Sequence, residues 1–202
     1  ANMAVPAEKI DAFLVSKAEF ILNAQKKFAL QEQYKPQPKQ YISGETFYLQ
    51  GRALRLKVIR ASKEQLYSDG VHLFLEVKDP QDFSKKERMV MRFFDRQCKE
   101  VFGEIVEELY PVFQKYGVAV PSLRIRSMDT RWGSCLPGKG VITLNKRLLE
   151  APRNCIEYVV MHELCHFIHP NHSKHFYAFL SMLMPDWKER KKVLDANDTY
   201  YL

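Results

Sequence analysis

The chain has 202 residues, enough for one domain or for a catalytic domain with a smaller module attached. Hydrophobic residues make up 46% of it and charged residues 27%, as is typical of a globular protein with a buried core, so the composition excludes a disordered chain. The formal net charge is +7, but the basic residues are scattered from Lys9 to Lys192. We therefore expect a solvated basic surface, and attraction to nucleic acid or another anion is the minority interpretation.

Cysteine usage and hydropathy indicate a cytoplasmic protein that has no membrane partner. The four cysteines form no CxxC pair and are interpreted as reduced thiols: Cys98, Cys135, Cys155 and Cys165. Charges interrupt the first 30 residues, so no secretory signal is expected there. No stretch approaches the roughly 20 apolar residues that a membrane-spanning helix requires.

The first 80 residues combine one helical segment with a strand-rich segment. Apolar residues at helical spacing predict a helix over 6–30, followed by a linker that contains Pro36 and Pro38. Four short runs rich in aromatic and β-branched residues predict strands: 47–49, 53–59, 65–67 and 71–77. Glycines and the Asp69-Gly70 pair punctuate these runs, which favours a meander of hairpins.

The remaining chain alternates helices with one pair of strands. Ser84 and Glu87 suggest a capping box before a long helix over about 85–115. Strands are expected over 123–127 and 141–144, then a helix from near Pro152 that Pro170 must end, then two short helices over 173–183 and from 186 onward. This order predicts an α+β fold with three parts: an N-terminal helix and linker (1–40), a β-rich meander (41–80) and the catalytic domain (81–202).

The sequence His162-Glu163-Leu164-Cys165-His166 predicts a metal site on the last long helix. Residues i and i+4 share one helix face, so both imidazoles can reach one zinc ion. Glu163 follows the first ligand and can take a proton from a zinc-bound water without being a ligand itself. Five of the six histidines fall within 14 residues, which strengthens the interpretation of this HExxH pattern.

A catalytic zinc usually has three protein ligands, and His172 is the favoured third one. It lies six residues after His166, the spacing seen in HExxHxxGxxH sequences. Pro170 would end the helix, Asn171 tolerates a tight turn, and Ser173 could cap the next helix. His169 is the alternative third ligand, although it is expected to support the ligands or line the pocket without binding the metal. His175 is expected on the surface or in a similar supporting position. A downstream glutamate ligand stays open.

The chain also resembles a known family on several blocks taken together. These blocks are Arg131-Trp132-Gly133-Ser134-Cys135, Ile142-Thr143-Leu144-Asn145, the nine residues from Tyr158 to His166, Asn171-His172-Ser173 with Phe176, and Met184-Pro185-Asp186-Trp187. They resemble the YgjP-like metallopeptidase domain family, which is related to the SprT-like and WLM zinc peptidases. The resemblance extends from about residue 41 and is less clear over residues 1–40.

The resemblance implies a zincin-like catalytic domain that binds Zn²⁺ through His162, His166 and His172 and uses Glu163 as the base. It also implies a peptide or protein substrate, bound by addition to an edge strand. Gly133 would then let the substrate backbone approach closely, and Arg131 is a candidate substrate contact. Trp132 is favoured as a core residue, and the role of Arg131 stays open.

Arg124 and Arg126 should alternate onto one face of the predicted strand. Ion pairs with surface carboxylates are the favoured interpretation. The alternative is an anion subsite beside the metal, with Arg126 as a substrate contact. Such a subsite and the basic surface would suit one alternative function, metal-dependent hydrolysis of a phosphate ester or nucleotide. The resemblance to the SprT-like relatives implies a second alternative, a DNA-associated protease. The favoured function remains a zinc metallopeptidase.

Overall fold

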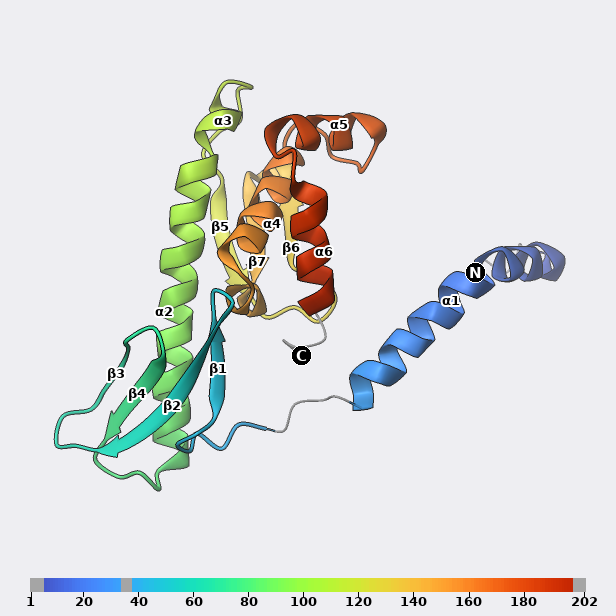
Figure 1. The fold of residues 1–202 in the computed structure, drawn as a ribbon. Coiled ribbons are helices and arrows are strands. Elements are labelled where there is room, and N and C mark those ends of the chain that lie inside the picture. The colour runs from blue at the N-terminus through green and yellow to red at the C-terminus, as the bar shows by residue number, and fades with distance from the viewer. Residues whose placement is uncertain (1–5, 34–37, 198–202) are drawn as a thin grey trace. The chain divides into compact units, whose positions relative to one another are not determined.

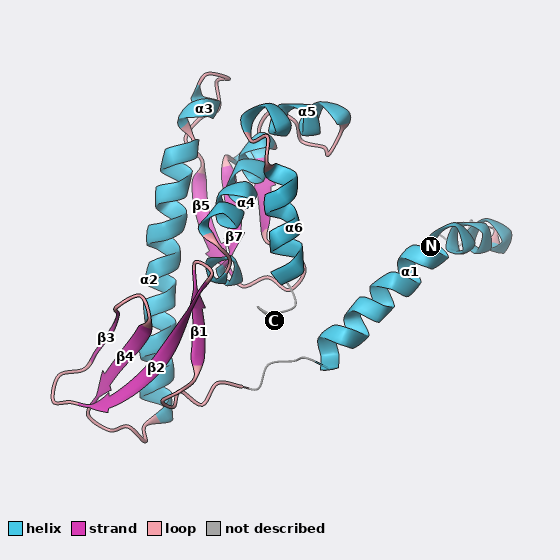
Figure 2. Cartoon of the chain, viewed as in Figure 1, coloured by secondary structure: helices cyan, strands magenta, loops and turns pink. Residues whose placement is uncertain are grey.

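The structure is a computed structural model that describes residues 6–33 and 38–197. The chain divides into two compact units, the first ending at Pro38 and the second beginning at Lys39. Figure 1 traces the elements in chain order, and Figure 2 separates helices from strands. The fold contains helices and two small sheets, so the predicted α+β class is confirmed.

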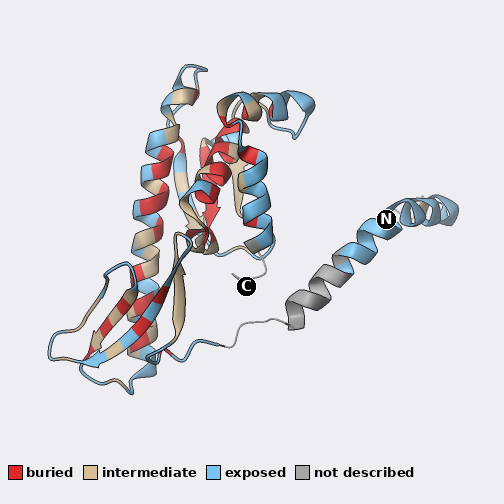
Figure 3. Cartoon of the chain, in the orientation of Figure 1, coloured by how far each residue is buried: buried red, intermediate tan, exposed pale blue. Residues whose placement is uncertain are grey.

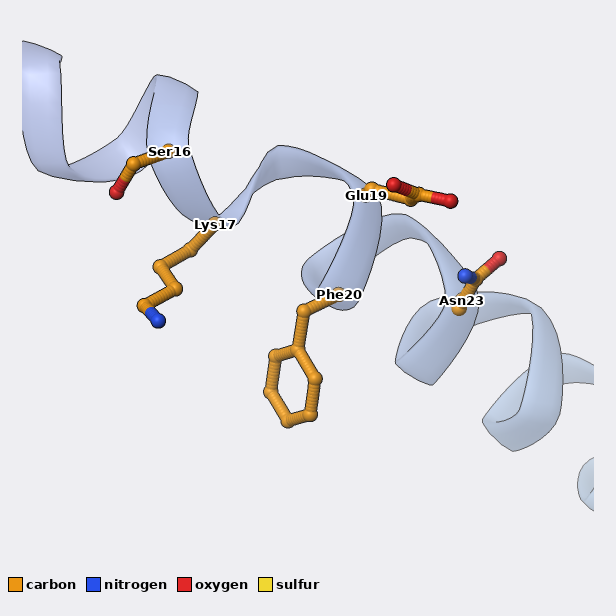
Figure 4. Close-up of a pocket in the computed structure, with 5 residues that line it drawn as sticks. All are labelled: Ser16, Lys17, Glu19, Phe20 and Asn23. Carbon is orange, nitrogen blue, oxygen red and sulfur yellow. The ribbon is translucent and has the colours of Figure 1, made fainter.

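The first unit is described as one helix, α1 (Ala7–Gln33), which matches the helix expected over 6–30. Its described apolar side chains are largely exposed, including Phe13 at 60% and Phe20 at 73%. A shallow hollow on α1 is lined by Ser16, Lys17, Glu19, Phe20 and Asn23 (Figure 4). All five belong to the same helix, so the hollow is part of the outer surface of α1.

The second unit starts with a four-stranded sheet in the order β1-β2-β4-β3. Its strands are β1 (Thr46–Leu49), β2 (Arg52–Arg60), β3 (Gln65–Ser68) and β4 (His72–Val77). All four lie where the sequence placed them, but the expected meander is wrong because β2 pairs with β4 in parallel. The Asp69-Gly70 turn folds β3 back on β4 as a hairpin, and β4 then lies between β2 and β3.

The β1–β2 hairpin is anchored to the other half of the unit by its turn. Gln50 and Gly51 both have positive φ, as a two-residue hairpin turn with a right-handed twist requires. The Gln50 and Gly51 N–H groups donate to the carbonyls of Leu149 and Glu150, at 2.8 and 2.9 Å. A Cβ atom on Gly51 would lie 2.9 Å from Cγ of Pro152, so only glycine fits there.

A long helix, α2 (Phe83–Leu109), follows the sheet, and a short α3 (Pro111–Gln114) continues it. The expected single helix is interrupted because Pro111 has no N–H group to continue the ladder. The expected capping box is also wrong, because the carboxylate of Asp82 accepts the N–H of Lys85 and Ser84 lies inside the helix. Buried residues of α2 belong to two hydrophobic clusters, one at each end of the helix.

The second sheet has the order β5-β7-β6, with β5 (Ser122–Arg126) parallel and β6 (Gly133–Leu136) antiparallel to the central β7 (Val141–Asn145). A 3₁₀ turn, η1 (Pro137–Lys139), joins β6 to β7. Gly133 and Ile125 both pair with Leu144, so these three residues share one face of the sheet. That face supplies Ile142 and Leu144 to the larger cluster.

Helix α4 (Arg153–Cys165) is the central element of this half, and η2 (Lys146–Glu150) leads into it. It contacts α2, β6, β7, α5 (Lys174–Leu183) and α6 (Trp187–Asn197). Figure 3 shows α4 and β7 among the most buried parts of the chain. Among the described residues, no helix is both long and apolar enough to cross a membrane.

Candidate metal centre

Three histidines meet at the C-terminal end of α4. His162 lies in its last turn and His166 caps it, so the i and i+4 spacing places both on one face as expected. His172 comes from the segment before α5, and its Nε2 atom lies 2.8 Å from Nε2 of His162. One ligand atom from each histidine lies within 4.8 Å of the other two, a spacing that can hold a metal ion.

The turn that brings His172 back follows the sequence closely. The last helical hydrogen bond of this region joins the His169 N–H to the Cys165 carbonyl at 2.9 Å, directly before Pro170. The Ser173 hydroxyl then accepts the N–H of Phe176 at 3.4 Å and caps α5, as expected. Pro170 and Ser173 thus set the length of the turn, and that length places His172 opposite His162.

Burial favours the neutral, metal-binding form of two of the imidazoles, those of His162 and His166. The pKa of His162 is lowered to about 3, first by burial and then by the neighbouring His166 and His172. Burial also lowers the pKa of His166. Neutral imidazole offers a nitrogen lone pair to a cation, whereas the protonated ring does not. The donor set therefore fits a metal ion such as zinc, for which imidazole is a common ligand.

Hydrogen bonding selects the ligating nitrogen of His166. Its Nδ1 atom lies 3.1 Å from the carbonyl oxygen of His169, so Nδ1–H donates there and Nε2 is left for a metal. The contribution of His169 is thus its backbone carbonyl, while its ring packs against Phe179. His162 differs, because its buried Nδ1 has no hydrogen-bond partner among the described residues.

Phe176 lies against all three histidines. Its ring centroid is 4.9 Å from those of His162 and His172 and 4.7 Å from that of His166. The side chain is fully buried. Sequence reasoning quoted Phe176 only as part of a motif and missed this contact. Phe176 follows His172 by four residues, and residues at this spacing share one face once a helix has begun. That spacing is the signal that could have revealed the contact.

Glu163 directly follows His162 in α4 and is buried, with only 5% of its surface exposed. Burial raises the pKa of its carboxyl to about 8, and the positive charge of Arg131 acts in the opposite direction. Gly133 approaches the carboxylate so closely that a Cβ atom there would lie 2.6 Å from Oε1. Arg131 and Gly133, predicted from the same sequence block, are thus both near the candidate base.

The buried side chain of Asn145 holds the segment that carries Arg131. Its Nδ2 atom donates to the carbonyls of Met128 and Arg131, at 2.7 and 2.9 Å. Its Oδ1 atom accepts the N–H groups of Met128 and Arg147, and its own N–H donates to the Trp132 carbonyl. This one residue therefore fixes the backbone that leads into β6.

The structure does not bring Arg124 and Arg126 to the histidines. They share one face of β5 as expected and are exposed, but the intervening Leu123 and Ile125 are the residues that pack on the core. The two arginines thus lie on the face of the sheet opposite Gly133 and Glu163. This placement gives no support to an anion subsite at Arg126 beside the metal, which had motivated the phosphate-ester alternative.

The other residues singled out in the sequence lie near their expected places. His175 is exposed on α5, and Cys165 is fully buried. Cys135 is a half-buried free thiol whose pKa is raised to about 12 by burial and by Glu163. Trp132 packs partly against the core, and the guanidinium of Arg147 lies over its ring.

A family model for the YgjP-like metallopeptidase domain matches residues 1–197. The chain belongs to the YgjP-like family. The match includes residues 1–40, where the sequence resemblance was less clear. As a member of this metallopeptidase family, the YgjP-like chain is a hydrolase that depends on a divalent metal.

One solved structure similar to the YgjP-like chain is the metallopeptidase zymogen of Methanocaldococcus jannaschii jannalysin. The two share 22% sequence identity with a TM-score of 0.40, over 47% of this chain and 88% of that one. No curated protein matches the YgjP-like chain.

Proposed function

We propose that this YgjP-like chain is a zinc metallopeptidase that hydrolyses peptide bonds in a peptide or protein substrate. The convergence of His162, His166 and His172, together with the buried carboxylate of Glu163 one residue after the first of them, carries the proposal. Three imidazole ligands would leave the fourth position of a zinc ion to water or substrate, as a catalytic zinc site requires. A purely structural metal site would need no carboxylate at this position.

In the proposed mechanism, the three histidines would hold Zn²⁺, and the bound ion would supply Lewis acidity that lowers the pKa of water. Glu163 accepts a proton from the attacking water and passes it to the nitrogen of the leaving amine. The His169 carbonyl keeps His166 in the tautomer that presents Nε2. Phe176 fixes the positions of the three rings.

The substrate is proposed to bind along β6. This strand is at one edge of its sheet, paired on one side with β7, and it contacts α4. An edge strand can add an extended peptide through backbone hydrogen bonds. Arg131, exposed before this strand, is the proposed contact for a substrate carboxylate or carbonyl. Arg131→Ala should then raise the KM for peptides more than it lowers kcat.

The deciding experiment compares Glu163→Gln with His166→Ala and the wild type after loading with zinc. Glu163→Gln should keep about one zinc per chain by elemental mass spectrometry yet release no new amino termini from peptides. His166→Ala should lose both the metal and the activity. A Glu163→Gln protein that still cleaves peptides refutes the assignment, and release of phosphate from phosphate esters by the wild type would refute the substrate class.

A further inference from the structure

The backbone conformation of Gly133 does not require glycine. It lies in the regular strand β6, paired with Leu144, and its φ is outside the positive range that favours glycine. Gly44, Gly51, Gly70, Gly117 and Gly140 do have positive φ values. The need for glycine at position 133 therefore comes from the space beside its Cα atom.

The side chain of Glu163 occupies that space. A Cβ atom built on Gly133 would lie 2.6 Å from Oε1, 2.9 Å from Cγ and 3.0 Å from Cδ of Glu163. Three atoms of the same side chain would be too close, so a rotation of the carboxylate alone would not relieve the contact. The whole side chain of Glu163 would have to move.

Neither the backbone at Gly133 nor the side chain of Glu163 can move easily to relieve this contact. The backbone before Gly133 is held by the Asn145 side chain, which accepts the N–H of Met128 and donates to the carbonyls of Met128 and Arg131. The neighbouring Trp132 carbonyl accepts a hydrogen bond from the Asn145 N–H at 2.9 Å. Glu163 lies on helix α4, and its own side chain is buried.

We infer that Gly133 is a positioning residue for Glu163: the missing side chain at 133 leaves the space that the Glu163 carboxylate occupies. This inference rests on the proposed function of Glu163 as the base. It also changes the role expected for Gly133 from the sequence. The space beside its Cα atom is filled by the base, so it is not available to a substrate backbone.

The activity arm of the test uses Gly133→Ala, with Gly138→Ala as the matched control. Gly138 is exposed, has no positive φ, and has no atom within 4 Å of a Cβ built on it. Gly133→Ala should keep stoichiometric zinc and an unchanged KM but lose on the order of 100-fold in kcat, as a misplaced catalytic group does. Gly138→Ala should match the wild type. Wild-type kcat in Gly133→Ala overturns the inference.

The stability arm needs no activity and places Gly133→Ala in two backgrounds. In the wild type it should lower the midpoint of urea unfolding, and in Glu163→Ala, where the crowding side chain is gone, it should lower it far less. Equal losses in both backgrounds overturn the inference. If Gly133→Ala alone does not fold, recovery of folding in the double variant supports the contact, and failure of both refutes it.

The two arms separate this inference from the proposed function. If Glu163→Gln proves active, the proposed function fails, while the stability arm still reports whether Gly133 and Glu163 are coupled. If the coupling is found but kcat is unchanged in Gly133→Ala, the contact is structural and the positioning role is wrong.

Discussion

Truncation of Phe176 should weaken metal binding beyond its effect on the stability of the fold. The Phe176 ring lies within 4.9 Å of three imidazole rings, centroid to centroid, so Phe176→Leu removes the surface against which they pack. The smaller side chain would leave each ring freer to rotate away from the ligating geometry. Groups that orient metal ligands typically contribute about 10–100-fold in metal affinity when they are changed.

A second buried phenylalanine, Phe113, provides a control for the loss of stability that any Phe→Leu change in the core causes. Phe113 is also fully buried in the same cluster, and its described ring contact is with Phe179, away from the three ligands. Both Phe→Leu variants should lower the free energy of unfolding of the zinc-free protein by about 1–2 kcal/mol, since each leaves a partly filled space in the core. Only Phe176→Leu should lower zinc affinity, by about 1.4–2.7 kcal/mol for a 10–100-fold change.

Zinc affinity would be measured by competition with a fluorescent chelator, and unfolding of the zinc-free protein by urea titration followed by circular dichroism. The ratio of the zinc dissociation constants of Phe176→Leu and Phe113→Leu is the decisive quantity. A ratio near one would show that Phe176 acts only as a core residue, and the reasoning about ring orientation would be refuted.

Two further predictions follow from the centre and its surroundings. His172→Ala should lose stoichiometric zinc by elemental mass spectrometry, whereas His169→Ala should keep it because only the backbone carbonyl of His169 is used; zinc loss in both variants would contradict the assignment. Glu150 has a pKa raised from the usual 4.5 to about 7 by burial, so its ionisation opposes folding. The unfolding free energy of the wild type, relative to that of Glu150→Gln, should therefore fall as pH rises from 4.5 to about 7 and stay level above pH 7. Urea titrations of both proteins across this range measure the difference. A difference that does not change with pH would exclude the effect.

The sequence located most helices and strands because periodicity and breakers are local signals. The end of the α4 region and the start of α5 were predicted from Pro170 and Ser173, whose effects act within one turn. The order of the first sheet was not predicted, because the parallel pairing of β2 with β4 joins segments that no local pattern connects. The sequence offered two possible capping side chains within three residues, Asp82 and Ser84. The structure uses Asp82, whereas Ser84 was expected.

For the candidate site, the sequence indicated the residue types but not which side of the sheet they occupy. The spacing of His162, His166 and His172 predicted a cluster, and the structure brings the three together. Strand alternation alone could not tell that Arg126 faces away from Glu163, because that depends on which face packs on α4. The contact between Gly133 and Glu163 is likewise a tertiary contact across 30 positions of chain.

Helix α2 contributes to two hydrophobic clusters, and this links their thermodynamics. Val90 and Phe93 belong to the cluster under the four-stranded sheet, while Phe102 and Ile105 belong to the cluster that surrounds α4. Phe94 packs against both. A fragment cut on either side of α2 would expose half of that helix to water. We therefore expect the two clusters to melt in a single cooperative transition, so that damage under the first sheet also lowers the fraction of molecules with an intact histidine cluster.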